Sequence, residues 1–281
     1  MSITAQPESS AAKGRRAPLK FEVVSSERLT RHMQRVVLAS HQFDEFARRF
    51  GGFTDSYVKL VFLAEGVDYP DPLDLDFVRQ SFPPEAQPVV RTYTLRGIDL
   101  EHGRITIDFV VHGDAGVAGP WAARAEPGDV LHVNGPGGAY APDPTAPWHL
   151  IAGDEAALPA IQAALEAMPA GARVHAYVEV DGPEDEQPVV SEADVTLTWL
   201  HRNGAPAGST TLIADAVRTD LWPEGAPHVF VHGESGLLKQ LRSYLLADRG
   251  VPRERLSLSG YWRRGETEEG FRAWKSTQPK A

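Results

Sequence analysis

The sequence contains no cysteine among its 281 residues. This absence excludes disulfides, a thiolate nucleophile and an iron–sulfur cluster held by cysteines. It fits a protein of a reducing compartment, and we expect a cytoplasmic location.

Long apolar runs and an excess of positive charge are also missing. No apolar run approaches the roughly 20 residues of a membrane-spanning helix. Residues 1–17 are polar and lack the apolar centre of a signal peptide, so we expect them to be disordered. The formal net charge is −10, whereas nucleic-acid binding needs a basic face. We therefore expect neither a nucleic-acid partner nor membrane insertion, and we expect a monomer.

The length of the chain suffices for two domains, and its composition, 42% hydrophobic and 23% charged, is that of a globular protein. Three prolines cluster in residues 141–147, where the character of the sequence changes. We place the boundary there, with one domain over residues 18–145 and the other over residues 146–281. The sequence shows no internal repeat.

Short runs rich in β-branched and aromatic residues dominate the first domain. They predict strands over residues 19–24, 33–38, 57–63, 89–96, 104–111 and 130–133. Residues 43–50 have the apolar spacing of one short helix, and residues 121–125 are helix-like. Residues 65–88 are rich in proline and aspartate, which predicts a long connection. Six strands with little helix predict an antiparallel β-barrel.

Strands and helices alternate in the second domain. The predicted strands cover residues 149–152, 173–180, 195–200, 228–232 and 256–260, and the predicted helices cover residues 159–168, 210–218 and 237–249. This alternation predicts a doubly wound parallel α/β sheet. Ligands of such sheets bind at the carboxyl ends of the strands, where Gly153 and Gly233 stand.

The predicted strand 89–96 carries Arg91-Thr92-Tyr93-Thr94, which combines a cation, a phenol and two hydroxyls. A cation can bind a phosphate, hydroxyls donate hydrogen bonds, and a tyrosine ring offers a stacking face. Residues 114–119 form a glycine-rich turn before a helix-like segment, and such a turn presents backbone N–H groups suited to a pyrophosphate. The simpler alternative is a barrel strand whose polar side chains face water.

Five short strings, in order along the chain, resemble those of the siderophore-interacting proteins. This family contains the cytoplasmic flavin-dependent ferric-siderophore reductases of the ferredoxin-reductase superfamily. The strings are residues 91–94, residues 108–113, residues 116–118 with 121–122, residues 153–160 and residues 260–262.

The resemblance implies FAD as the cofactor, held by the barrel. The implied FAD-binding residues are Arg91, Thr92, Tyr93, Thr94, Asp108, Phe109, Val110, Val111, His112, Gly116, Val117, Ala118, Gly119 and Trp121. Taken singly, Trp121 has the alternative of a packing residue, and His112 that of an ordinary barrel histidine.

The resemblance also implies NADH or NADPH as a co-substrate of the second domain. The implied residues are Gly153, Asp154, Glu155, Ala157, Leu158, Arg202, Gly233, Glu234, Tyr261 and Trp262. Gly153-Asp154-Glu155 replaces the Gly-Thr-Gly turn of other superfamily members, and an acidic pair does not attract a phosphate. Glu179 and Asp181 argue against binding of a 2′-phosphate, whereas Arg202 argues for it. The choice between NADH and NADPH stays open.

The implied reaction needs no acid–base side chain, because a flavin can accept a hydride and give single electrons to Fe(III). We name no catalytic side chain and no metal ligands. An anionic ferric siderophore would need cations beside the flavin, and our candidates are Lys59, Arg255, Arg263 and Arg264. Relatives have further basic residues where this chain has Gly137 and Ser257.

The favoured function is transfer of electrons from NAD(P)H through FAD to ferric siderophores, with release of Fe(II). A general diaphorase-type flavin reductase and a siderophore-binding protein without turnover are the alternatives, and a ferredoxin is an alternative donor. Residues 266–281 carry Phe271 and Trp274 three positions apart. We expect a short helix there, either docked near the nucleotide site or simply packed.

Overall fold

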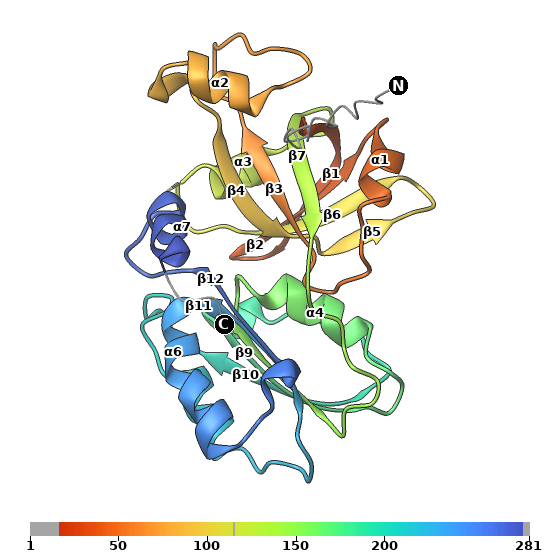
Figure 1. The fold of residues 1–281 in the computed structure, drawn as a ribbon, viewed down its shortest axis with the longest axis vertical. Coiled ribbons are helices and arrows are strands. Elements are labelled where there is room, and N and C mark those ends of the chain that lie inside the picture. The colour runs from red at the N-terminus through yellow and green to blue at the C-terminus, as the bar shows by residue number, and fades with distance from the viewer. Residues whose placement is uncertain (1–16, 115, 278–281) are drawn as a thin grey trace, which may run out of the picture.

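Two sheets organise the chain, an antiparallel one and a parallel one (Figure 1). The structure is a computed structural model and describes residues 17–114 and 116–277. Of the segment predicted to be disordered, residues 1–16 lie outside the described residues. Among the described residues, no helix has the length and apolar character that crossing a membrane requires.

The antiparallel sheet forms the predicted barrel. Its strands are β1 (Leu19–Thr30), β2 (Met33–Ala39), β3 (Tyr57–Phe62), β4 (Val89–Thr94), β5 (Gly97–Asp99), β6 (Arg104–Val110) and β7 (Val130–Gly137), in the order β4-β3-β7-β1-β2-β6-β5. The count is seven because the chain bends after β4. β4 pairs with β3 and β5 pairs with β6, and the Arg96 N–H donates to the Thr106 carbonyl over 2.9 Å. The bend thereby closes the sheet.

Alternate residues of the strands fill the barrel. On β6, Ile105, Ile107 and Phe109 are fully buried, as the two-residue period of a strand requires. Helices α1 (Phe43–Ala47) and α3 (Ala118–Arg124) close the barrel, and the Phe46 ring meets the Phe21 ring edge-on at 5.4 Å. Complete burial of a side chain of this kind contributes about 1.5–3 kcal/mol.

The long connection predicted over residues 65–88 contains helix α2 (Leu75–Ser81) and a 3-10 turn, η1 (Pro84–Ala86). The Asp74 carboxylate caps α2 by accepting from the N–H groups of Asp76 and Phe77, both at 3.0 Å. Val78 buries itself against Val61 of the barrel. A helix of seven residues between prolines gives too short a periodic pattern to be predicted from sequence.

The parallel sheet confirms the predicted α/β architecture. Its strands are β8 (His149–Asp154), β9 (Arg173–Val180), β10 (Asp194–His201), β11 (His228–Glu234) and β12 (Leu256–Trp262), in the order β10-β9-β8-β11-β12. The principal helices are α4 (Leu158–Glu166), α5 (Leu212–Thr219) and α6 (Ser235–Ser243), and a π turn, η3 (Tyr244–Asp248), follows α6. Short 3-10 turns occur at η2 (Pro183–Asp185) and η4 (Arg253–Arg255).

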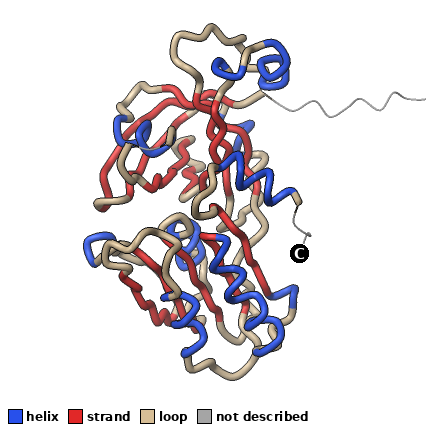
Figure 2. Tube along the Cα trace, turned by 90° about the vertical axis from the view of Figure 1, so that its left-hand side faces the viewer, coloured by secondary structure: helices blue, strands red, loops and turns tan. Residues whose placement is uncertain are grey.

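The two sheets meet across α4, which lies between the barrel and the parallel sheet (Figure 1). The apolar cluster on this face includes Met33 and Val110 from barrel strands, whereas α5 and α6 cover the opposite face. A last helix, α7 (Glu268–Ser276), runs along the side of the molecule between β4 and β12 (Figures 1 and 2). The carboxyl ends of β8 and β11 therefore face the barrel.

Candidate functional site

Strand β4 presents its two faces to different surroundings. Tyr93 turns toward the barrel core, where its ring lies 4.5 Å from that of Phe109. Thr92 and Thr94 point the other way, toward α7 and β12. Thr94 is buried and Thr92 is exposed. The predicted Arg91-x-Tyr93-Thr94 string thus lies where the barrel meets the second domain.

Arg91 and Thr92 form an anion-binding group at this place. The Arg91 guanidinium is ion-paired with Glu269, and its Nε lies 3.6 Å from Glu268 Oε2. Glu268 Oε1 also accepts from the Thr92 N–H at 3.1 Å and from the Thr92 hydroxyl at 3.3 Å. A guanidinium, an N–H and a hydroxyl are also a suitable donor set for a phosphate. The carboxylates of α7 therefore occupy a site whose chemistry fits a flavin phosphate.

Helix α7 is held in this position by contacts with β12. Phe271 is buried and lies against Gly260, and the Lys275 ammonium donates to the Gly260 carbonyl over 3.0 Å. The Arg263 guanidinium lies over the Trp274 ring at 4.6 Å. The helix expected over residues 266–281 is thus present and docked against both domains, although residues 278–281 lie outside the described residues.

The predicted pyrophosphate loop leads into α3. Gly119 fits closely against β6, because a Cβ at this position would lie 3.2 Å from the Val110 carbonyl oxygen. The Trp121 ring contacts the rings of Phe62 and Phe109, both at 5.7 Å. Trp121 therefore makes packing contacts in the barrel, and its contact with FAD stays a prediction. His112 is exposed.

Asp108, a predicted flavin residue, is engaged in a network that joins the domains. Both its carboxylate oxygens accept from Arg35, each at 2.7 Å, and the carboxylate is almost completely buried. Arg96 lies 3.8 Å from the same carboxylate and donates to Gln162 at 3.1 Å and to Glu166 at 2.9 Å, both on α4. The network fixes the outer face of β6 against the second domain.

Two acidic side chains occupy the carboxyl ends of the parallel strands. Asp154 Oδ1 accepts from the N–H groups of Ala156 and Ala157 before α4, at 3.0 and 3.3 Å. Its Oδ2 accepts from the Glu234 N–H and the Trp262 indole N–H, both at 2.8 Å. Burial raises the pKa of Asp154 to about 6, although the hydrogen bonds oppose this shift.

Glu234 plays the same role at α6. Its carboxylate caps the N–H of Gly236 and accepts from the Arg264 N–H at 3.1 Å. A cavity of about 30 Å³ between the strands is lined by Asp154, Glu179 and Glu234 among others. Helix N-termini usually receive a nucleotide phosphate in this fold. Here Glu234 caps the N-terminus of α6, and Asp154 binds the turn that leads into α4.

Two glycines allow the close approach of β8 and β11 around Asp154. Gly233 has φ +132°, and a Cβ on it would lie 2.7 Å from the Asp154 carboxylate. A Cβ on Gly153 would lie 2.6 Å from the His232 carbonyl oxygen. Both positions were predicted from sequence to lie at the site, and both admit only the smallest residue.

Arg202, the candidate partner of a 2′-phosphate, is already neutralised. Its guanidinium donates to both Glu155 oxygens, at 3.0 and 2.9 Å, and lies 3.5 Å from Asp181. A phosphate would have to displace two carboxylates to bind this arginine.

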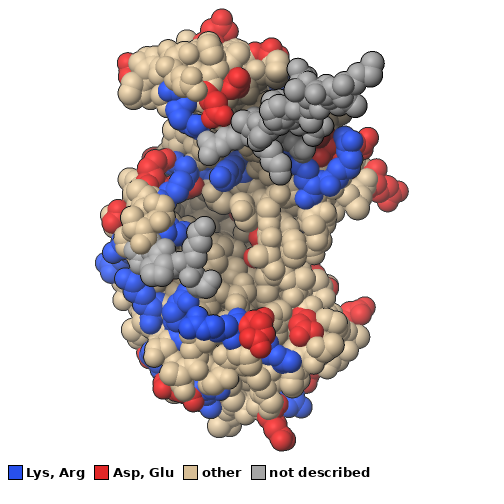
Figure 3. Space-filling view, in the orientation of Figure 1, with Lys and Arg blue, Asp and Glu red and all other residues tan. Residues whose placement is uncertain are grey.

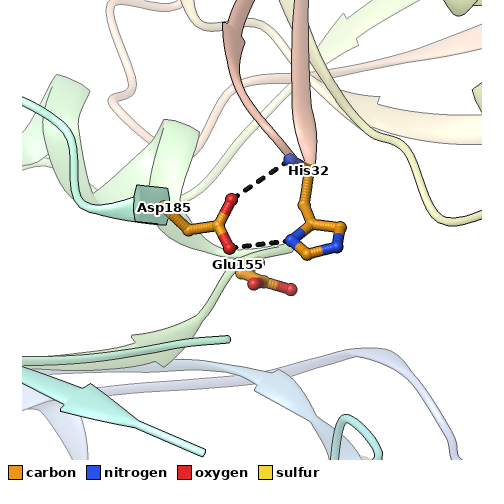
Figure 4. A group of neighbouring side chains, drawn as sticks. All are labelled: His32, Glu155 and Asp185. Atoms are coloured by element: carbon orange, nitrogen blue, oxygen red, sulfur yellow. Dashed lines mark hydrogen bonds and ion pairs between the residues drawn. The ribbon is translucent and has the colours of Figure 1, made fainter. Parts of the chain in front are cut away.

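A second contact between the domains involves His32, in the turn between β1 and β2 (Figure 4). Its N–H donates to Asp185 Oδ1 at 3.1 Å, and its ring Nδ1 lies 2.7 Å from Oδ2. Glu155 lies close enough for the three side chains to hold a cation, but it already binds Arg202. The contact is therefore assigned to holding the domains together.

The four candidate cations for a siderophore do not gather in one place. Lys59 is exposed on β3, and Arg263 and Arg264 follow β12 next to α7. Arg255 precedes β12, at its opposite end, and donates to the Ala226 carbonyl over 2.8 Å. On the face drawn in Figure 3, Lys and Arg side chains form a band across the part of the second domain that lies beneath the barrel.

Sequence reasoning missed a buried polar chain beside β4. His232 is 1% exposed; its Nδ1 lies 3.0 Å from the Tyr261 hydroxyl and its Nε2 2.8 Å from the Ser257 hydroxyl. Burial lowers the pKa of His232 to about 3, so its ring is neutral. The Tyr261 phenol in turn interacts with the Thr94 side chain. Thr94, Tyr261 and Ser257 had been named from the sequence for other reasons and His232 was missed, because no local pattern links four residues on three strands.

Comparison with known proteins supports the resemblance along most of the chain. Residues 22–140 match the family model of the siderophore-interacting FAD-binding domain, and residues 146–265 match that of the siderophore-interacting protein. An uncharacterized protein of Mycobacterium tuberculosis is 47% identical over 273 residues, which cover 93% of this chain and 95% of the relative. Ferric vibriobactin reductase of Vibrio cholerae is 37% identical over 193 residues, 67% of this chain and 69% of the relative.

Solved structures agree. A siderophore utilization protein from T. fusca superposes with a TM-score of 0.75 at 37% identity, covering 88% of this chain and 93% of that one. The siderophore-interacting protein SipS from Aeromonas hydrophila has a TM-score of 0.76 at 29% identity, covering 92% and 97%. A ferredoxin reductase of carbazole 1,9a-dioxygenase, at 18% identity and a TM-score of 0.63, covers 87% and 69% and shares the fold.

Proposed function

The chain belongs to the siderophore-interacting protein family, and from this premise we propose that it reduces ferric siderophores. In the proposed reaction, electrons from a nicotinamide donor pass through FAD to the ferric complex, and iron leaves as Fe(II). The family membership and the FAD-binding domain make it a siderophore-related flavin oxidoreductase. The acceptor, the donor and the cytoplasmic location are parts of the proposal.

The anion-binding group at Arg91 and Thr92 is the observation that carries this proposal. It lies between the barrel and the second domain, within the region matched by the FAD-binding model. We propose that Arg91 and the Thr92 N–H bind a flavin phosphate and that Thr94 faces the flavin ring. Tyr93, packed against Phe109 on the opposite face of β4, would support this strand from the barrel side.

Bound FAD would supply the conversion between a two-electron donor and a one-electron acceptor. The protein's part is to orient the ring and to set the charges around it. Fe(III) binds hard oxygen ligands more tightly than Fe(II) does, so reduction would loosen the hold of the siderophore. Arg263 and Arg264 follow β12 next to α7 and are the cations that we propose to attract an anionic complex, with Lys59 on the barrel side.

One observation favours a second donor, a ferredoxin. Of the sites that would bind the pyrophosphate of NADH or NADPH, the turn before α4 is bound by Asp154 and the N-terminus of α6 is capped by Glu234, and Arg202 is neutralised by Glu155. A protein donor would need none of these sites. The residues from Gly153 to Leu158, with Tyr261 and Trp262, remain our prediction for a nicotinamide donor.

Anaerobic stopped-flow measurements test the proposal. The purified protein is expected to bind FAD, to be reduced by NADH, NADPH or a reduced ferredoxin, and to release Fe(II), detected with a ferrous chelator, from a ferric siderophore. Failure to take up FAD would end the proposal. Equal rates with quinones or free flavin would indicate a general reductase, and siderophore binding without flavin reduction by any donor would indicate a binding protein.

A further inference from the structure

Four neighbouring polar groups run from β4 of the barrel to the edge strand of the second sheet. They are the hydroxyls of Thr94 and Tyr261, the imidazole of His232 and the hydroxyl of Ser257. Thr94, Tyr261 and His232 lie in the interior or at the domain interface, whereas Ser257 is partly exposed on β12. The order of the groups makes one continuous path from the proposed flavin strand to solvent.

We propose that this chain, Thr94–Tyr261–His232–Ser257, is a proton relay that carries the flavin's proton to solvent. The inference rests on the proposed function, because it takes β4 as the strand that faces the flavin ring. Its geometry also holds independently, since the 3.0 and 2.8 Å contacts on the two ring nitrogens of His232 are both within hydrogen-bonding distance.

The chemistry requires such a path. A flavin that has been reduced by hydride transfer holds two electrons and one proton that it did not have when oxidised. When two Fe(III) ions take the electrons one at a time, the proton must leave the ring as well. A neutral imidazole can accept a proton at one nitrogen and release another from the second nitrogen, so no charge needs to remain in the interior.

The steps balance through the chain. With FAD bound, Thr94 would accept a proton at its oxygen and give its own proton to the Tyr261 oxygen. Tyr261 would give a proton to His232 Nδ1, and His232 Nε2–H would give one to Ser257, which would pass a proton to water. No oxidant beyond the ferric acceptor is needed.

Burial and a nearby charge both favour a neutral ring on His232. Burial is the largest effect that lowers its pKa, and the nearby Lys275 ammonium on α7 lowers it further. Tyr261 likewise stays neutral, because burial and the nearby carboxylates of Asp55 and Asp154 raise its pKa. Both groups therefore stay neutral, and each can accept one proton while it gives up another.

The test compares electron loss with proton release. The FAD-loaded protein is reduced with one equivalent of dithionite in weak buffer and mixed with ferricyanide, and the flavin absorbance and a pH-indicator dye are followed together. In the wild type, proton release should keep pace with flavin oxidation. In Tyr261→Phe and His232→Phe, proton release should lag, or both signals should slow, by about tenfold or more. Tyr177→Phe removes another phenol of the same domain and should change neither signal.

Two further measurements separate a relay from a structural role. Added imidazole should restore proton release in His232→Gly but not in Tyr261→Phe. In the FAD-free protein, the ¹⁵N resonance of His232 Nδ1 should shift in Tyr261→Phe while that of Nε2 stays. Unchanged proton release in both relay variants, or an Nδ1 resonance insensitive to Tyr261→Phe, would overturn the inference. Because the acceptor is ferricyanide, a failure to reduce ferric siderophores would count against the proposed function alone.

Discussion

Replacing both α7 carboxylates by amides, in Glu268→Gln with Glu269→Gln, should tighten FAD binding. The two carboxylates surround the guanidinium and the N–H that we propose for a flavin phosphate. A phosphate that arrives there meets like charge or must displace it. Glutamine keeps an acceptor for the Thr92 N–H and preserves the length of the side chain, so α7 should stay docked through Phe271.

The size of the effect follows from the exposure of the two carboxylates. Two unit charges about 6 Å apart repel by about 0.7 kcal/mol at the dielectric constant of water and by about 2.8 kcal/mol at an effective value of about 20, so a partly solvated pair near the lower limit repels by about 1 kcal/mol. Glu268 is 23% exposed and should contribute most of this repulsion, whereas Glu269, at 58%, is screened and should add only a few tenths of a kcal/mol. Together these terms predict a Kd for FAD that is lower by about tenfold.

The assay is a titration of the FAD-stripped protein, followed by quenching of flavin fluorescence. The gain should shrink as salt is raised toward 1 M, where the Debye length is about 3 Å. Glu254→Gln, an exposed carboxylate in η4 before β12, is the matched control and should leave the Kd unchanged. A weaker Kd in the double variant would show that α7 holds the flavin rather than competes with it, and the reasoning would be refuted.

Three other outcomes follow from the same geometry. Glu234→Ser keeps a helix cap but removes the charge, so the Kd for NADH should fall by a few-fold, measured by equilibrium titration. Burial lowers the pKa of His149 to about 4, so the stability that its neutral ring contributes is complete above pH 6.5 and is lost as the pH falls. At pH 5 the free energy of unfolding should be lower by about 2 kcal/mol than at neutral pH. Urea unfolding of His149→Asn should not show this pH dependence. Arg96→Ala cuts the bridge to Glu166, and limited proteolysis should then cleave the segment between the domains faster.

The sequence carries the architecture because each domain repeats a local period. Barrel strands such as β6 alternate apolar and polar residues, and the buried strands of the second domain are interrupted by helices with a 3.6-residue spacing. The same two-residue period could have shown that Thr92 and Thr94 face away from Tyr93. Helix α2 escaped prediction because its seven residues owe their stability to the Asp74 cap and to Val78.

The site itself depends on contacts between distant residues, and local patterns do not encode these. Asp108 was singled out by its string, but its partner Arg35 lies 73 positions away. The acidic Asp154 was visible in the sequence, yet its hydrogen bonds to the turn before α4 and to Trp262 appear only when β8, β11 and β12 come together. Residue type predicted the charge at each position, whereas the fold decided what the charge binds.

The distribution of charge on the two sides of the domain interface argues for different roles of the two domains. The barrel side offers a guanidinium and an N–H whose present partners, the α7 carboxylates, belong to a helix held by a few contacts with β12. On the other side, the carboxylates of Asp154 and Glu234 are built into the ends of the sheet and are buried there. A ligand phosphate would therefore gain a site on the barrel by displacing one helix, but on the sheet it would have to displace Asp154 and Glu234 from their buried hydrogen bonds. Under the proposed function, this difference would place tight phosphate binding with the flavin and would leave the donor to bind weakly and exchange rapidly.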